Sequence, residues 1–231
     1  SYEYIKTAIK YALEKKIDSI VTAPICKASL ALAGIPYTGH TTMLSDLTNS
    51  PETSMAFYTE KLKTVLVTIH KPFKEVPKLL TEKNLSKAVE NSFIFAKQLG
   101  LKNPRIAIAG LNPHAGEDGL FGTEEQEQII PVINKYIQKD QKVFGPFPAD
   151  TIYHQAYNGE FDIVISLYHD QGLIPIKLLA FDKAVNITLG LPFLRTSPDH
   201  GTAFNITGKN QASPLSMINA IKYVLSTSEN S

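Results

Sequence analysis

Cysteine is almost absent from this chain, which has a single one, Cys26. A lone cysteine excludes an intrachain disulfide framework and a four-cysteine zinc site, and it is typical of proteins in a reducing compartment. We therefore expect a cytoplasmic protein. The longest apolar runs, such as residues 163–167, are far shorter than the roughly 20 residues that span a bilayer. Residues 1–16 predict an amphipathic helix with charges throughout, which is not the pattern of a secretory leader.

The chain also lacks an excess of charge of either sign. It has 23 basic and 22 acidic residues and a formal net charge of +1. Such a balance produces no overall field that would attract nucleic acid or an anionic membrane, so we expect neither as a partner. Internal repeats and low-complexity tracts are missing too. No Gly-x-Gly-x-x-Gly sequence follows a predicted strand, and a standard Rossmann nucleotide site is therefore unsupported.

Short apolar runs rich in β-branched residues alternate with segments of helical periodicity. The first are typical of buried parallel strands and the second of amphipathic helices, so the alternation predicts an α/β fold with a mainly parallel sheet. Thr123-Glu124-Glu125-Gln126 predicts a capping box at the start of one helix. The predicted strands are 19–22, 64–69, 105–109 and 162–167, and the predicted helices are 2–15, 85–99, 124–137 and one that begins at Ser213-Pro214.

Three of the six histidines follow the carboxyl ends of predicted strands. His70 and His169 come directly after a strand, and His114 follows one after a short turn. Ligands bind at this edge of open α/β sheets, and three imidazoles with an open fourth position are typical of catalytic zinc. Each histidine taken alone is better explained as a loop residue hydrogen-bonded to the backbone, but the three together favour a metal site. Asp170 either orients the imidazole of His169 or caps the next helix.

Polar side chains suited to an anion occur in two further segments. His40 and Thr41 lie in a glycine-bounded loop and offer imidazole and hydroxyl donors for a phosphate or carboxylate, although a turn with incidental polar residues is the alternative. Lys177, Asn186 and Arg195 supply an amine, an amide and a guanidinium. Arg195 is able to hold a carboxylate or phosphate through two parallel hydrogen bonds.

Read in order, six segments closely resemble the 4-hydroxythreonine-4-phosphate dehydrogenase family. The tail Ser197-Pro198-Asp199-His200-Gly201-Thr202-Ala203 with Gly208-Lys209-Asn210 is also similar to the adenosine-binding loop of the isocitrate and isopropylmalate dehydrogenase superfamily, whose NAD site is not a Rossmann site. The six segments are Thr22-Ala23-Pro24-Ile25-Cys26-Lys27, Gly34-Ile35-Pro36-Tyr37-Thr38-Gly39-His40-Thr41, Leu111-Asn112-Pro113-His114-Ala115-Gly116-Glu117, Gly145-Pro146-Phe147-Pro148-Ala149-Asp150-Thr151, Tyr168-His169-Asp170-Gln171-Gly172-Leu173 and Val185-Asn186-Ile187-Thr188-Leu189-Gly190-Leu191-Pro192.

The resemblance implies a fold of the isocitrate/isopropylmalate dehydrogenase type, with mainly parallel sheets, flanking helices and two domains with a cleft between them. Residues 1–33 and 170–231 are expected to form the nucleotide-binding domain. Residues 34–169 are expected to form the domain for dimerisation, metal and substrate. Family members carry an additional N-terminal segment with a Gly-Asp-Pro-Ala-Gly-Ile-Gly-Pro-type loop. This chain begins after it, so we expect part of the nucleotide domain and substrate site to be missing and turnover by this chain to be weak or absent.

The resemblance also implies the ligands of the site. It implies a homodimer whose subunits share each active site, NAD or NADP as cofactor, and one divalent metal, zinc with magnesium or cobalt as alternatives. The roles it implies are metal binding by His70, His114 and His169, substrate binding by His40, Thr41, Lys177, Asn186 and Arg195, cofactor binding by His200, Gly201 and Asn210, and proton removal by Lys177 or Asp150.

The implied reaction is oxidation of 4-phosphooxy-L-threonine to a 3-oxo acid that loses carbon dioxide, on the way to pyridoxal phosphate. Three alternatives stay open. The first is a dehydrogenase for another phosphorylated hydroxy acid such as 4-phosphoerythronate. The others are a zinc hydrolase or aldolase, since a three-histidine site also activates water, and a shortened homologue that binds metal without turnover.

Overall fold

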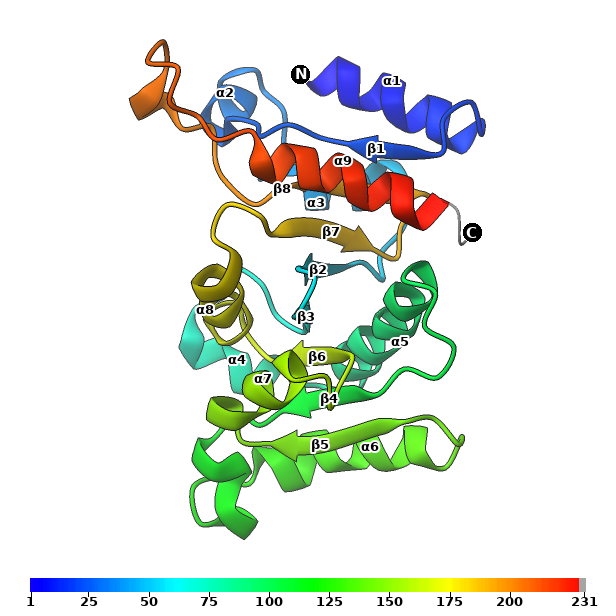
Figure 1. The fold of residues 1–231 in the computed structure, drawn as a ribbon, viewed down its shortest axis with the longest axis vertical. Helices are drawn as coiled ribbons and strands as arrows, with labels where there is room; N and C mark the ends of the chain where they lie inside the picture. Colours follow the sequence, from blue (N-terminus) through cyan, green and yellow to red (C-terminus); the bar gives the residue numbers. More distant parts are fainter. Residues whose placement is uncertain (229–231) are drawn as a thin grey trace. The chain divides into compact units, whose positions relative to one another are not determined.

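The computed structural model describes residues 1–228, which form two compact units (Figure 1). Unit 1 joins Ser1–Met55 to the segment from Asp182 onward, and unit 2 is Ala56–Phe181. The domains predicted from the sequence, residues 1–33 with 170–231 and residues 34–169, stay a prediction. In the structure helix α3 (His40–Leu47) packs on the first helix of unit 1, and helix α8 (His169–Ala180) packs on strands of unit 2.

Unit 1 is built on three strands. Strand β8 is central, parallel to β1 and antiparallel to β7. Helix α9 packs on β8 and β7, and the first helix, α1, packs on β1 and α3. Ile9, Ile20 and Met43 lie in an apolar cluster formed by α1, β1, α2 and α3. The elements are α1 (Tyr2–Leu13), β1 (Ser19–Val21), α2 (Lys27–Leu32), α3 (His40–Leu47), β7 (Val185–Leu189), β8 (Leu194–Pro198), the 3-10 turn η4 (Phe204–Ile206) and α9 (Leu215–Ser228).

Unit 2 contains four parallel strands in the order β3-β6-β4-β5. The end of β2 (Ser54–Tyr58) pairs with β3 in the antiparallel direction. Every residue of β4 and β6 is buried, which explains why all of them except Ser166 at the end of β6 are apolar. The elements are β3 (Lys63–Leu66), η1 (Phe73–Glu75), α4 (Val76–Leu79), α5 (Glu82–Gln98), β4 (Ile106–Ala109), η2 (Pro113–Gly119), η3 (Glu125–Ile129), α6 (Ile130–Ile137), β5 (Val143–Phe147), α7 (Ala149–Tyr157), β6 (Ile163–Ser166) and α8.

Helices cover the strands of unit 2. Helices α5 and α6 contact each other, with α5 on β3 and β6 and α6 on β5, while α7 and α8 both pack on β6. The α/β class with mostly parallel strands is therefore confirmed, although β2 and β7 run antiparallel to their partners. Within residues 1–228, no helix has both the length and the apolar content that a membrane crossing requires.

The predicted capping box is wrong. The residue before η3 is Glu124, which makes no side-chain cap hydrogen bond, and this segment begins as a π-helix rather than an α-helix. The reason is that Glu125 turns inward, where its carboxylate accepts hydrogen bonds from the backbone N–H groups of Leu111 and Asn112, both at 2.7 Å. The start of the helix is thus set by a long-range contact instead of a local cap.

Gly172 shows how closely α8 packs on the sheet. A Cβ atom at this position would lie 2.7 Å from Cδ2 of Leu66 and 2.9 Å from Oγ of Ser166. We expect Gly172→Ala to lower the free energy of unfolding by about 1–3 kcal/mol, since overpacking outweighs the better helix propensity of alanine. Urea denaturation measures this. Gly201→Ala, at a glycine with open space around it, is the control; equal stability of the two variants would contradict the packing.

Candidate functional site

His70 and His169 lie side by side at the carboxyl ends of β3 and β6. The parallel register pairs Leu66 with Ser166, and beyond the strands Thr68 N still donates to the carbonyl oxygen of Leu167 at 3.2 Å. The two segments of the chain therefore stay paired almost as far as the two histidines. Their ring centroids are 5.5 Å apart. The convergence predicted from strand ends is found for this pair.

A carboxylate supports one of the two rings. Asp170 Oδ1 lies 2.6 Å from Nδ1 of His169, so this nitrogen carries the proton of the hydrogen bond and Nε2 is left as the free donor for a metal. Two neighbouring imidazoles, one of them oriented by a carboxylate, are a donor set that suits zinc and related divalent ions. His70 and His169 thus fit the expected metal, and other residues would supply its further ligands.

His114 lies on a loop after β4 and is exposed. Its ring packs on Phe121 with centroids 6.0 Å apart, and its Nδ1 is 3.5 Å from Oε2 of Glu117. Within residues 1–228 of one chain, no three histidine, cysteine, aspartate or glutamate side chains are grouped so as to hold a metal ion. Two of the three predicted ligands are together, and ligation by His114 stays a prediction.

The two predicted proton acceptors also belong to unit 2. Lys177 lies in the last turn of α8, the helix that His169 begins, and its Nζ is 5.2 Å from the ring centroid of Phe181. Asp150 lies exposed in the first turn of α7. The geometry of neither residue tests its predicted role.

Arg195 on β8 is a buried cation in unit 1, with 3% of its surface exposed. Its Nη1 donates to Oγ1 of Thr188 at 2.9 Å and its Nη2 to Oγ1 of Thr22 at 2.7 Å. Both acceptors are neutral, and Nε is buried with no hydrogen-bond partner among residues 1–228. Burial lowers the pKa of the guanidinium to about 10. A buried charge whose acceptors among the described residues are neutral hydroxyls would be stabilised by an anion.

His40 adds a second nitrogen group close to this cation. It begins α3, and burial, followed by the positive charge of Arg195, lowers its pKa to about 4, so the ring is neutral at pH 7. Thr41 follows it and is partly buried. On β7, Asn186 has a buried Oδ1 without a hydrogen-bond partner among the described residues. The antiparallel register pairs Thr188, two residues after Asn186, with Arg195.

The predicted cofactor residues lie on the loop between β8 and α9. The ring of His200 donates from Nδ1 to the carbonyl oxygen of Gly201 at 2.9 Å, and Asn210 has a left-handed backbone with φ of 53°. All three residues are exposed. Unit 1 thus carries the predicted cofactor residues and all predicted substrate-binding residues except Lys177, while unit 2 carries the three predicted metal ligands, Lys177 and Asp150.

The family described as pyridoxal phosphate biosynthetic protein PdxA matches residues 1–224. The chain belongs to this family. A 4-hydroxythreonine-4-phosphate dehydrogenase of Desulforapulum autotrophicum is 46% identical, covering 95% of this chain and 65% of the relative. A D-threonate 4-phosphate dehydrogenase of Pectobacterium atrosepticum is 45% identical, covering 97% of this chain and 69% of the relative. The chain therefore spans about two thirds of these relatives, which are named as dehydrogenases.

The fold of this chain is similar to solved structures of proteins named as 4-hydroxythreonine-4-phosphate dehydrogenases. The crystal structure of a 4-hydroxythreonine-4-phosphate dehydrogenase from Klebsiella pneumoniae is 42% identical and superposes with a TM-score of 0.90, covering 98% of this chain and 69% of that one. An isocitrate dehydrogenase from Methylococcus capsulatus is similar at a TM-score of 0.50 and 13% identity, which concerns the fold alone. The predicted isocitrate dehydrogenase-like fold of the PdxA-type chain is thus confirmed.

Several residues around the site were missed from the sequence. Thr22 and Thr188 hold the guanidinium of Arg195, and Gln171 and Glu125 bind the backbone near His114. Thr22 was named at the end of a predicted strand and in one of the six resembling segments, but without a role in the site. Its position next to that strand's carboxyl end, the criterion used for the histidines, was the available signal. For Glu125, the capping-box pattern masked its long-range role.

The lowered pKa of His40 predicts a pH dependence of stability. The pKa of His40 is about 6.5 in the unfolded chain and about 4 in the folded chain. Between these pH values the imidazole therefore binds a proton in the unfolded chain but not in the folded chain. The free energy of unfolding therefore keeps the full contribution of neutral His40 above pH 6.5, and it loses this contribution as the pH falls from 6.5 to 4. After allowance for partial exposure, we expect wild type to lose about 1–2 kcal/mol more than His40→Gln between these limits. Denaturant titrations at each pH measure the free energy of unfolding of both proteins. Equal losses in wild type and His40→Gln would contradict the lowered pKa of His40.

Proposed function

We propose that this protein catalyses the NAD-dependent oxidation of 4-phosphooxy-L-threonine to the 3-oxo acid, which then decarboxylates to 3-amino-2-oxopropyl phosphate, in pyridoxal 5'-phosphate biosynthesis. The observation that carries the proposal is the neighbouring pair His70 and His169, with ring centroids 5.5 Å apart, in a chain of the PdxA family. The relatives' names support a phosphorylated hydroxy acid as the substrate class. We place the reaction in the cytoplasm.

His70, His114 and His169 would hold one divalent metal, zinc with magnesium or cobalt as alternatives. When bound, such an ion acts as a Lewis acid that lowers the pKa of a hydroxyl group and stabilises negative charge on oxygen. Asp170, by accepting a hydrogen bond from Nδ1–H of His169, would fix the tautomer of the neutral ring in which Nε2 offers its lone pair to the ion. Lys177 or Asp150 would accept the proton of the substrate's secondary hydroxyl.

The groups of unit 1 would bind the substrate's anion and the cofactor. Arg195, with two hydroxyl acceptors and no acidic partner in the described chain, would pair with the phosphate or carboxylate. His40 and Thr41 would donate to the same anion, and Asn186 would supply its amide. His200, Gly201 and Asn210 would bind NAD or NADP, the oxidant that accepts hydride when bound.

A homodimer with shared active sites is part of the proposal. Helix α8, which begins with His169, exposes Ile174 by 65%, Leu178 by 85% and the following Phe181 by 75%. These residues are spaced three to four apart and form one stripe of the helix. An exposed apolar stripe next to a predicted metal ligand is suited to a subunit contact, through which a partner subunit would contribute to the site.

D-threonate 4-phosphate is a second candidate substrate because the 45% identical relative from Pectobacterium atrosepticum is named for it. It carries a hydroxyl group in place of the amino group of 4-phosphooxy-L-threonine. 4-Phosphoerythronate is a further member of the same class. The residues that contact this amino or hydroxyl group decide the preference, and either choice leaves the metal and cofactor roles unchanged.

The test is the reduction of NAD or NADP, followed at the absorbance band of the reduced cofactor, with each of the three substrates. The protein is expressed from its complete reading frame. We expect kcat/KM to be highest with 4-phosphooxy-L-threonine. A higher value with D-threonate 4-phosphate would establish the second candidate. Binding of metal and NAD without reduction of either cofactor would instead indicate a non-catalytic homologue, and release of product without reduction would indicate a hydrolase or aldolase.

A further inference from the structure

Glu125 is a buried carboxylate to which the proposed function gives no role. It lies at the start of η3 with 1% of its surface exposed. Its Oε1 accepts from the backbone N–H groups of Leu111 and Asn112, each at 2.7 Å, and its Oε2 accepts from Nδ2 of Asn112 at 2.9 Å. All of these donors belong to the start of the loop that carries His114. Hydrogen bonds to a charged acceptor are among the stronger ones in proteins.

That loop has an unusual backbone. Residues 114–118 have φ angles between 42° and 86°, and only one of the five, Gly116, is a glycine. L-residues normally visit this left-handed region singly, because the Cβ atom approaches the carbonyl oxygen. A run of five persists only where the surrounding structure holds it. The orientation of the His114 imidazole therefore depends on whatever holds the loop.

The loop folds closely around Glu125. A Cβ atom on Gly116 would lie 2.7 Å from Oε2 of Glu125, and one on Gly110 would lie 2.8 Å from Cα of Ala115. These glycines permit the approach of the backbone to the carboxylate. Since Glu125 contacts the first residues of the loop and its middle, it fixes both parts relative to η3.

Gln171 connects the same loop to the other histidines. It is buried, its Nε2 donates to the carbonyl oxygen of Gly110 at 2.7 Å, and its Oε1 accepts from the N–H of Leu167 at 2.6 Å. Leu167 and Gln171 flank His169 in sequence. The beginning of the His114 loop is thereby tied to the end of β6, where His169 and His70 meet.

We infer that Glu125 is a positioning residue for His114. It keeps the left-handed loop in the one conformation that presents the imidazole of His114 as a metal ligand, while Gln171 fixes the loop to the strand end of His169. The inference rests on the proposed function in one respect, the ligation of metal by His114. Glu125 itself contacts neither metal nor substrate.

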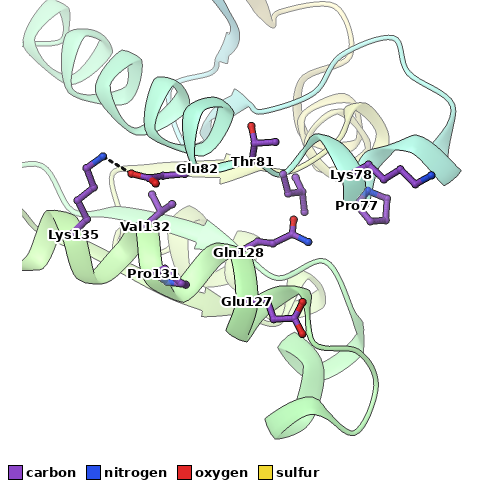
Figure 2. Close-up of a pocket in the computed structure, with 10 residues that line it drawn as sticks. Pro77, Lys78, Thr81, Glu82, Glu127, Gln128, Pro131, Val132 and Lys135 are labelled. Carbon is purple, nitrogen blue, oxygen red and sulfur yellow. Dashed lines mark hydrogen bonds and ion pairs between the residues drawn. The ribbon is translucent and has the colours of Figure 1, made fainter.

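The experiment compares Glu125→Gln and Glu125→Leu with Glu127→Gln and Glu127→Leu. Glu127 lies two residues away and lines a surface pocket of about 520 Å³ between α4, α5 and α6 (Figure 2). Its replacement removes the same charge from the same element. In each full-chain variant, zinc affinity is measured by competition with a chromogenic chelator, and protection of the Leu111 and Asn112 amides by hydrogen exchange.

In the Glu125 variants we expect faster exchange of both amides and zinc binding weaker by about 10- to 100-fold, the usual effect of losing support behind a metal ligand. The Glu127 variants are expected to match wild type in both. If Glu125→Leu does not fold, Glu125→Gln decides. The inference is supported when both changes occur in one folded variant. A Glu125→Gln protein with wild-type amide exchange or wild-type zinc affinity would overturn it. Equal losses in the Glu127 variants would overturn it as well.

His114→Ala separates this inference from the proposed function. If His114→Ala loses zinc affinity while the Glu125 variants keep it, His114 is a ligand and only the positioning role of Glu125 is wrong. If His114→Ala binds zinc as tightly as wild type, the predicted ligand set is wrong, and the role of Glu125 toward it is wrong as well.

Discussion

Replacing His70 or His114 with alanine is expected to abolish turnover and to weaken zinc binding by more than about 100-fold, since even the loss of a group behind a ligand has an effect of 10- to 100-fold. The fold should survive, because both side chains are exposed and lie in loops beyond the strand ends. Zinc titration, NAD reduction and thermal unfolding of each variant measure the three quantities.

His154→Ala is the matched control for these variants. His154 is also exposed, lies on α7 and contacts the amide of Asn158 instead of another histidine. We expect it to bind zinc and turn over substrate as wild type does. A His70→Ala protein that keeps most of its turnover would show that the metal mechanism is wrong, whatever the result for His114.

Arg195→Lys is expected to reduce kcat/KM for the phosphorylated substrate by roughly 10- to 100-fold, the equivalent of one charge-assisted hydrogen bond of about 1.5–3 kcal/mol. The substitution keeps the positive charge. Lysine, however, lacks the planar fork that lets Arg195 bond to Thr22 and Thr188 and still face an anion. Steady-state kinetics with 4-phosphooxy-L-threonine in the protein expressed from its complete reading frame measure the effect.

Thr188→Val serves as the control for Arg195→Lys. It removes one neutral acceptor of the guanidinium, so it should destabilise the protein by about 1–3 kcal/mol through the donor left unpaired, with a smaller change in kcat/KM. The two variants together separate loss of anion binding from loss of folding. An unchanged kcat/KM in Arg195→Lys would exclude Arg195 as the residue that pairs with the substrate's anion.

The strands that the sequence predicted have short apolar runs, and the predicted helices have a helical period. Residues 106–109 and 163–166 are buried throughout, and all of them except Ser166 are apolar, as is typical of buried strands. Strands β2, β7 and β8 were missed because each mixes apolar with polar residues, and β5 was missed because it contains the pair Gly145-Pro146. Their pairing depends on neighbouring strands, which periodicity along one segment does not report.

The candidate site was predictable where it follows from topology. Strand ends that carry histidines meet when the strands are neighbours, which holds for β3 and β6 and their residues His70 and His169. The left-handed loop of His114 was not predictable, because non-glycine residues such as Ala115 and Glu117 give no local sign of positive φ. Its conformation depends on the distant carboxylate of Glu125, a tertiary contact.

The initial rate of NAD reduction with 4-phosphooxy-L-threonine, measured before and after removal of metal, shows whether the reaction requires a metal. The protein is expressed from its complete reading frame, treated with a chelator, and then given back one equivalent of zinc, magnesium or cobalt per subunit. We expect chelation to abolish reduction and one of these ions to restore it. Reduction that continues unchanged in metal-free protein would contradict the proposal that His70, His114 and His169 hold a metal required for the reaction.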